Sequence, residues 1–269
     1  MPAKTPGDLW RSAASVDPTR PFITAYDASG GRVELSFATF DNWVAKTSNM
    51  IVDGLGAEPG ARIALALPVH WQSLVWLVSS WTTGLNVIPA TAASLGEDDP
   101  DIVVTAADGM DAALATGADE VVATSLHPLG APLATCPPAV LDYAVEVRGH
   151  GDRFTPGGPV DPDAPALSWH PGPYSGAELA DRALDRYAKS ELTSSDRVAI
   201  ITNESETLAA LGPDLSDFLF PVAGALSLVL SHETDSARVQ SQLRTERVTA
   251  LVGRHDRFSD LPTGIRHLS

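Results

Sequence analysis

The sequence contains one cysteine and no long apolar run. Cys136 is the only cysteine among 269 residues, so the chain can form no internal disulfide and suits a reducing compartment. No stretch approaches the roughly 18 uninterrupted apolar residues of a membrane-spanning helix. The first residues also lack the apolar run of a signal peptide. These absences predict a cytoplasmic protein, and Cys136, which has no cationic neighbour in the sequence, is expected to be structural.

Basic residues, and lysine above all, are scarce. The chain has 18 lysines and arginines against 34 acidic residues, a formal net charge of -16. A field of this sign repels phosphate backbones and anionic lipid, so we expect neither nucleic acid nor a membrane as a partner. Only Lys4, Lys46 and Lys189 are lysines. An acidic, solvated surface that keeps the protein in solution is the simplest explanation of the charge.

Short buried runs alternate with helical segments along most of the chain. Strands are expected near residues 22–26, 32–37, 62–67, 85–89, 102–105, 120–124, 166–169, 197–201, 226–230 and 248–252. Helices are expected near residues 9–15, 38–54, 71–83, 109–115, 177–192, 208–223 (with a break around Pro213) and 236–246. This order predicts an α/β fold of layered, largely parallel sheets with packing helices.

Two features refine this prediction. Residues 71–83 are apolar on two faces, so this helix and its three tryptophans (Trp71, Trp76 and Trp81) are expected to pack between layers. Stretches rich in proline and glycine interrupt the pattern at 128–138 and 155–165. The second stretch predicts a boundary near residue 160, with a first α/β subdomain at 1–160 and a second, tightly associated one at 161–269.

An ordered set of motifs lies between Glu34 and Pro89. It reads E-L-S-F-A-T-F-D-N-W-V-A-K-T-S-N-M, then G-L-G-A-E-P-G-A-R-I-A-L-A-L-P-V-H-W, then S-S-W-T-T-G-L-N-V-I-P. In order, spacing and glycine placement it resembles the opening of the acyl-adenylate-forming (AMP-binding) superfamily of acyl-CoA synthetases, luciferases and adenylation domains. The stretches L-T-S-S-D-R-V-A-I (192–200) and F-P-V-A-G-A-L-S-L-V-L (220–230) are similar to later passages of that family. The resemblance implies a truncated relative that corresponds to the N-terminal half.

The resemblance places the family's phosphate-binding loop, S-G-T-T-G-x-P-K-G, at A-L-S-W-H-P-G-P-Y-S-G-A-E-L (166–179). Small residues in such a loop let backbone N–H groups and hydroxyls approach phosphates while a lysine neutralises charge. Prolines and aromatic residues add bulk here, and no lysine lies nearby. An ordinary strand-to-helix turn is the competing interpretation. The candidate ligand-binding residues at this degenerate loop are Ser168, His170, Gly172, Ser175 and Gly176.

Other features of the family are replaced or missing. Glu204 and Glu206 stand where the resemblance places an aromatic residue or histidine that shapes the acyl pocket. The adenine motif and the C-terminal domain with its catalytic lysine have no counterpart before Ser269. We therefore expect no catalytic residue. The resemblance admits ATP, AMP or CoA as a ligand, but the altered loop argues against each of them.

Metal ligation is not expected either. The seven histidines are dispersed, without the spacing of a metal site. His232, Glu233 and Asp235 are close in sequence but follow a strand, and we expect them to form a solvated helix cap.

The sequence thus predicts a non-catalytic, truncated homologue of acyl-CoA synthetases that acts as a binding or regulatory module. Its partner would be another protein or a small acyl or nucleotide ligand. The alternative is an acyl-adenylate or acyl-CoA ligase that a partner chain completes, or whose pocket serves another reaction. A third class is a pure interaction protein.

Overall fold

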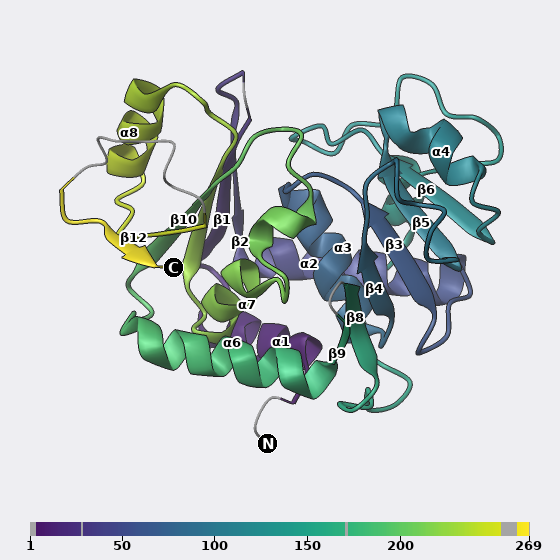
Figure 1. Cartoon of the computed structure of the whole chain (residues 1–269), viewed down its shortest axis with the longest axis horizontal. Coiled ribbons are helices and arrows are strands. Elements are labelled where there is room, and N and C mark those ends of the chain that lie inside the picture. Colours follow the sequence, from purple (N-terminus) through teal and green to yellow (C-terminus); the bar gives the residue numbers. More distant parts are fainter. Residues whose placement is uncertain (1–3, 28, 170–171, 254–262, 269) are drawn as a thin grey trace.

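The computed structural model describes residues 4–27, 29–169, 172–253 and 263–268. They form two sheets with helices between and around them (Figure 1). The first sheet has the order β13-β12-β10-β11-β1-β2, and the second has the order β7-β6-β5-β3-β4-β8-β9. Among these strands the pairs β1–β2 and β8–β9 are antiparallel and every other pair is parallel. The predicted layered, largely parallel α/β fold is confirmed.

The strands follow the buried runs of the sequence. The first sheet contains β1 (Pro21–Tyr26), β2 (Arg32–Ser36), β10 (Arg197–Ile201), β11 (Ser227–Ser231), β12 (Ala250–Val252) and β13 (Arg266–Leu268). The second contains β3 (Arg62–Ala66), β4 (Asn86–Pro89), β5 (Ile102–Ala106), β6 (Glu120–Thr124), β7 (Leu141–Asp142), β8 (Pro165–Trp169) and β9 (Gly172–Ser175).

Helices fill the space between the sheets and cover their outer faces. The α-helices are α1 (Pro6–Val16), α2 (Phe37–Asn49), α3 (Trp71–Thr82), α4 (Met110–Leu114), α5 (Tyr143–Glu146), α6 (Gly176–Ser190), α7 (Ser216–Ala223) and α8 (Ser236–Thr245). Figure 1 shows α2, α3 and α7 between the sheets, α1 and α6 along the lower side, and α8 and α4 on opposite outer faces. No helix in the described part of the chain is both long and apolar enough to cross a membrane.

Alternation along the strands divides the core into three parts. In β10, Val198 and Ile200 join the large inner core whereas Ala199 packs under α8. In β5, Ile102 and Val104 face the inner core and Val103 faces outward to the α4 side. Successive strand residues point to opposite faces, so a run of apolar residues is needed where both faces are covered. This explains the uninterrupted apolar runs at 198–201 in β10 and 102–104 in β5.

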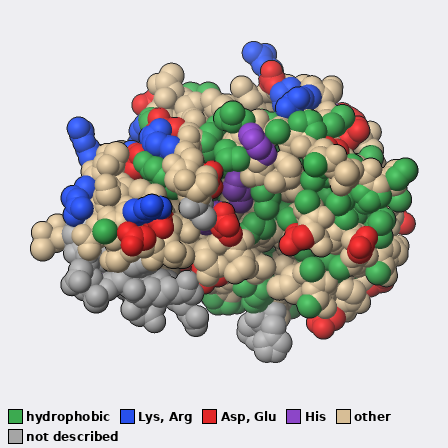
Figure 2. Space-filling model, turned by 90° about the horizontal axis from the view of Figure 1, so that it is seen from above, with side chains coloured by type: hydrophobic (Ala, Val, Ile, Leu, Met, Phe, Trp, Pro, Cys, Tyr) green, Lys and Arg blue, Asp and Glu red, His purple; other side chains and the backbone are tan. Residues whose placement is uncertain are grey.

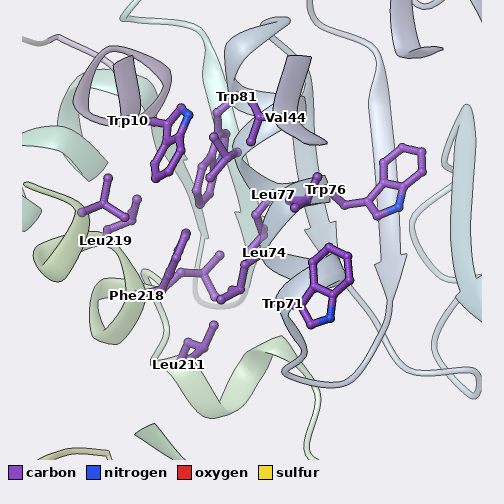
Figure 3. Packing of buried hydrophobic residues seen from close by; sticks show 14 of the residues in the cluster. Trp10, Val44, Trp71, Leu74, Trp76, Leu77, Trp81, Leu211, Phe218 and Leu219 are labelled. Atoms are coloured by element: carbon purple, nitrogen blue, oxygen red, sulfur yellow. The ribbon is translucent and has the colours of Figure 1, made fainter. Parts of the chain in front are cut away.

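Helix α3 occupies the centre of the inner core. Every residue from Trp71 to Trp81 is buried, as expected for a helix between two layers. Trp71, Trp76 and Trp81 are 1%, 0% and 2% exposed. Figure 3 shows them leaving the helix in different directions, with Trp76 directed away from the side that holds Trp10 and Trp81. The prediction that these tryptophans pack between layers is confirmed.

Within each sheet, the order of the strands differs from their order along the chain. Strands β1 and β2 pair with β11, and β8 and β9 pair with β4, so strand pairing crosses residue 160 in both directions. The division into subdomains at 1–160 and 161–269 stays a prediction. Four short elements were not expected from the sequence: α5, β7, β9 and β13. The expected break near Pro213 separates a 3-10 turn at Leu208–Leu211 from α7.

Candidate functional site

The segment predicted as a degenerate phosphate loop forms a β-hairpin that leads into α6. Ser168 lies in β8, Gly172 and Ser175 lie in β9, and Gly176 is the first residue of α6. His170 lies outside the described residues. The expectation of a simple strand-to-helix turn is wrong, because β9 intervenes. Pro173 does not prevent this pairing, since β9 is the edge strand of its sheet and an edge strand tolerates a missing N–H donor.

The hydroxyl of Ser168 is already engaged within the protein. It lies 2.9 Å from Nδ2 and 3.1 Å from Oδ1 of Asn86 on the neighbouring strand. Its oxygen therefore has both a donor and an acceptor beside it, and these two side chains tie β8 to β4. Sequence reasoning missed Asn86, because 82 residues separate it from Ser168 and no local pattern links them.

The N-terminus of α6 is closed by its own side chains. Ser175 Oγ accepts from the backbone N–H of Glu178 at 3.2 Å, and Glu178 Oε2 accepts from the backbone N–H of Ser175 at 2.8 Å. This is a capping box, which the S-x-x-E spacing in the sequence could have indicated. The two intervening amides, of Gly176 and Ala177, donate to the carbonyls of Ala164 and Pro162. All four amides that could face an anion thus have partners.

The charge at this helix terminus also opposes a phosphate. A helix N-terminus attracts anions, but here the carboxylate of Glu178 already occupies that position. Lys189, in the last turn of α6, pairs with Asp185 at 2.6 Å. The cation that the fold brings to β9 is Arg182, whose guanidinium lies 5.1 Å from the centre of the Tyr174 ring and 3.5 Å from Asp214. Arg182 was not among the sequence candidates.

The carboxyl ends of β1, β3 and β11 meet at the crevice between the sheets, the usual position of ligands in open α/β folds. His232 Nε2 lies 2.6 Å from the carbonyl oxygen of Val69, and the Val69 amide donates to the Glu206 carbonyl at 2.9 Å. The remaining cavity beside His70 has a volume of only about 10 Å³. Figure 2 shows histidine side chains among apolar ones in the middle of this upper face. Beside His70, side chains of the protein thus leave little space for a ligand.

His70 is unsuited to acid–base chemistry at neutral pH. Its Nδ1 accepts from the backbone N–H of Gln72 at 3.3 Å and caps α3. Burial lowers the pKa of His70 to about 3, with a further lowering from His232 and an opposing effect of Asp27. The imidazole is therefore neutral at physiological pH and serves as a hydrogen-bonding cap.

The expected solvated cap at His232, Glu233 and Asp235 is only partly correct. Asp235 caps α8 by accepting from the backbone N–H of Arg238 at 2.9 Å. His232 and Glu233, in contrast, are 7% and 6% exposed, so the expectation of a solvated position is wrong for both. The ring of His232 lies against Val69, and the Glu233 carboxylate accepts from the backbone N–H groups of Thr234 and Asp235.

The remaining sequence candidates are also accounted for by local structure. Glu204 is exposed, and Glu206 Oε2 accepts from the backbone N–H of Asn203 at 2.8 Å. Cys136 is exposed and its thiol donates to the carbonyl of Val140 at 3.1 Å. Partial burial, helped by the charge of Asp142, raises the pKa of this thiol. Within the described ranges, no three His, Cys, Asp or Glu side chains are grouped to hold a metal ion.

Comparisons with known proteins find a relative by sequence and solved structures that share the fold. No family model matches the chain. A protein of Mycobacterium tuberculosis (strain ATCC 25618 / H37Rv), described as a TIGR03089 family protein, is 35% identical over 263 residues. The match covers 93% of this chain and 99% of that protein.

Solved structures share the fold at low identity. A Brucella canis acyl-CoA synthetase matches with a TM-score of 0.75 and 17% identity, covering 94% of this chain and 48% of its own. The N-terminal domain of FACL13 from Mycobacterium tuberculosis matches with a TM-score of 0.73 and 15% identity, covering 98% of this chain and 68% of its own. The chain thus spans about half to two thirds of the solved chains that it matches. Identities this low show the fold alone.

Proposed function

The chain belongs to the TIGR03089 family, and on that premise we propose that it acts as a non-catalytic binding or regulatory module. It keeps the fold of an acyl-CoA synthetase N-terminal domain. In this proposal it forms no acyl adenylate. Its partner is another protein or a small acyl or nucleotide ligand that is held without chemistry.

One observation supports this proposal: among the described residues of 168–177, the two serine hydroxyls and the amides of residues 175–177 bond within the protein. Ser168 bonds to Asn86, and the Ser175–Glu178 capping box closes the helix terminus. Phosphoryl and adenylyl transfer depend on donors and cations that stabilise the charge developing on phosphorus. Here a carboxylate stands at the helix terminus, and the described lysines lie elsewhere or are paired.

The crevice between the sheets supports the same proposal. A nucleotide or drug-sized ligand needs a pocket of about 300–1,000 Å³, whereas the cavity beside His70 in this crevice has a volume of about 10 Å³. A buried nucleotide would require the contact between His232 and Val69 to open. A partner that binds at the surface requires no such change.

The test is pyrophosphate exchange into ATP over a panel of carboxylic acids, with a full-length acyl-CoA synthetase as the positive control. We expect no exchange above the rate without protein. A thermal-shift series with ATP, AMP, CoA and acyl-CoAs then separates binding from chemistry, because a ligand of the folded state raises the melting temperature. Acid-dependent exchange that survives purification would overturn the proposal.

The alternative is a ligase that a partner chain completes. Two observations support this alternative. The match covers only 48% of the Brucella canis acyl-CoA synthetase. Arg182 also places a cation beside Tyr174 in β9. For this function, exchange should appear only when the protein is isolated from its source cells together with co-purifying proteins. Arg182→Gln should then reduce it, whereas Arg244→Gln, on the exposed side of α8, should not.

A further inference from the structure

Two adjoining cavities lie at the other end of α3 from His70. The larger, of about 930 Å³, lies between the start of α1, the end of α3 and the segment 156–162. The smaller, of about 310 Å³, lies between α1, α2 and the segment 152–156. Gly7, Arg11, Thr82 and Pro156 line both, so the two form one groove. Its volume is in the range of small-molecule sites.

Gly7 allows a close contact between two helices at this groove. A Cβ at this position would lie 3.1 Å from the Cα of Thr82 and 3.2 Å from the carbonyl oxygen of Trp81. The glycine therefore lets the N-terminus of α1 approach the C-terminus of α3 closely. The floor between these helices is apolar, with Trp10, Val44, Trp81 and Phe154 among its lining residues. In Figure 3, Trp10, Trp81 and Val44 lie at the same end of the core cluster.

Two buried hydroxyls on this lining have no hydrogen-bond partner among the described residues. They are Ser48 Oγ, from a side chain that is 0% exposed, and Thr82 Oγ1. Neighbouring hydroxyls on the same helices are satisfied: Ser79 donates to the Val44 carbonyl and Thr47 bonds to Tyr143. An unsatisfied buried hydroxyl is unfavourable, so the two groups would gain from a ligand atom that donates or accepts.

The charged side chains around the groove balance one another. Three are basic and three acidic: Lys4, Arg11, Arg153, Asp8, Asp41 and Asp152. Arg11 pairs with Asp8 at 2.8 Å, and Asp152 pairs with Lys46 at 2.8 Å. Asp41 accepts from Trp10 Nε1 at 2.8 Å. The formal charges of the lining residues cancel, Lys46 beside Asp152 adds one positive charge, and the overall charge of -16 opposes anions, so the groove strongly favours an ion of neither sign.

We propose that this groove binds an uncharged organic molecule with a flat, apolar body and one amide, carbonyl or hydroxyl head. The body packs between Trp81 and the proline-rich segment. The head bonds to the hydroxyls of Ser48 and Thr82, which have no accessible surface in the free protein and are reached when the segment 152–156 moves aside. The site shares no residue with the 168–176 hairpin or with the crevice at His70. It is therefore independent of the proposed loss of adenylate chemistry.

The test compares benzamide with benzoate, which have nearly the same shape and differ in charge. Binding to the full chain is followed by NMR through the indole N–H signals of Trp10 and Trp81, with those of Trp71 and Trp76 as internal references. We expect saturable shifts of the first pair with benzamide up to about 20 mM, the range for a probe of about nine heavy atoms. Benzoate should bind at least about fivefold more weakly.

The benzamide affinity of serine and threonine variants tests where the polar head of the ligand binds. Ser48→Ala should weaken benzamide binding at least about fivefold without lowering the melting temperature, because the hydroxyl has no partner in the free protein. Ser73→Ala is the matched control, since Ser73 Oγ is also buried without a partner but does not line the groove. Thr82→Val gives the second measurement if Ser48→Ala fails to fold. The proposal would be overturned by the absence of saturable shifts or by tighter binding of benzoate than of benzamide. Wild-type affinity for benzamide in both Ser48→Ala and Thr82→Val would also overturn it.

Discussion

At the scale of single residues, a buried carboxylate organises one face of the first sheet. Glu246 Oε1 accepts from the Tyr26 hydroxyl at 2.6 Å and from Arg32 Nε at 2.9 Å, and Oε2 forms an ion pair with Arg197 Nη1 at 3.0 Å. The side chain is 4% exposed. Burial would raise the pKa of Glu246, but the bonds from Arg32 and Tyr26 and the charge of Arg197 outweigh it and hold the pKa below its usual range.

Glu246→Gln should destabilise the protein in a pH-dependent way. At pH 7 we expect a loss of about 2 kcal/mol in the free energy of unfolding, since hydrogen bonds to charged groups contribute about 1.5–3 kcal/mol. A carboxylate with a lowered pKa in the folded state stabilises above its unfolded pKa and loses this contribution as the pH falls. The difference between wild type and variant should therefore shrink between about pH 5 and pH 3. Urea unfolding across this range measures it.

The control is Glu97→Gln, at an exposed position between β4 and β5 of the second sheet. Its stability should match the wild type at every pH. A constant difference between Glu246→Gln and the wild type down to pH 3 would contradict the coupling of Glu246 to the two arginines.

At the scale of an element, the N-terminus of α6 is closed by its own side chains and by neighbouring carbonyls. The first turn of α6 satisfies its amides through Ser175, Glu178 and the carbonyls of residues 162 and 164. The same feature that starts the helix thus removes the donors that an anion would need. The bonds that stabilise this helix terminus are therefore the same bonds that leave its amides unavailable to an anion.

Removing the capping box should lower stability by a measurable amount. Ser175→Ala should cost about 1 kcal/mol, as for other N-cap hydroxyls, and Glu178→Gln should cost less because an amide retains the hydrogen bond. The double variant should cost less than the sum of the two, because the residues form one unit. Urea unfolding of the three variants gives the comparison, and strict additivity would mean that the box does not form in solution.

At the scale of the whole molecule, α3 joins the two sheets. It lies within the core cluster that takes side chains from both sheets and from α1, α2, α6 and α7. Trp76 is fully buried, and its ring centre lies 5.1 Å from that of Tyr143 in α5. The contacts at its N-terminal end, through Val69 and His232, hold the two sheets together at the crevice.

Trp76→Ala should therefore destabilise the entire fold. We expect a loss of about 4 kcal/mol, in the range for large aromatic residues removed from cores. Leu129→Ala, at a side chain that is 77% exposed, is the control and should change stability by less than about 0.5 kcal/mol. Unfolding followed by circular dichroism measures both. A loss under about 1 kcal/mol for Trp76→Ala would show that the centre of the core is loosely packed.

The sequence by itself determined most of the elements and the fold class, because buried strands and amphipathic helices are set by local periodicity. It also indicated the central position of α3, since a helix that is apolar on two faces needs a layer on each side. The capping box of α6 also has a local sequence signal, the S-x-x-E spacing of Ser175 and Glu178, from which the start of the helix can be predicted.

Only the tertiary structure decided the state of the candidate site. Ser168 is satisfied by Asn86, 82 residues away, and His232 is buried against Val69, 163 residues away. Strand β9 forms despite Pro173 because it lies at a sheet edge. Such outcomes depend on which strands become neighbours, and strand order is set by the packing of the whole chain rather than by any local segment.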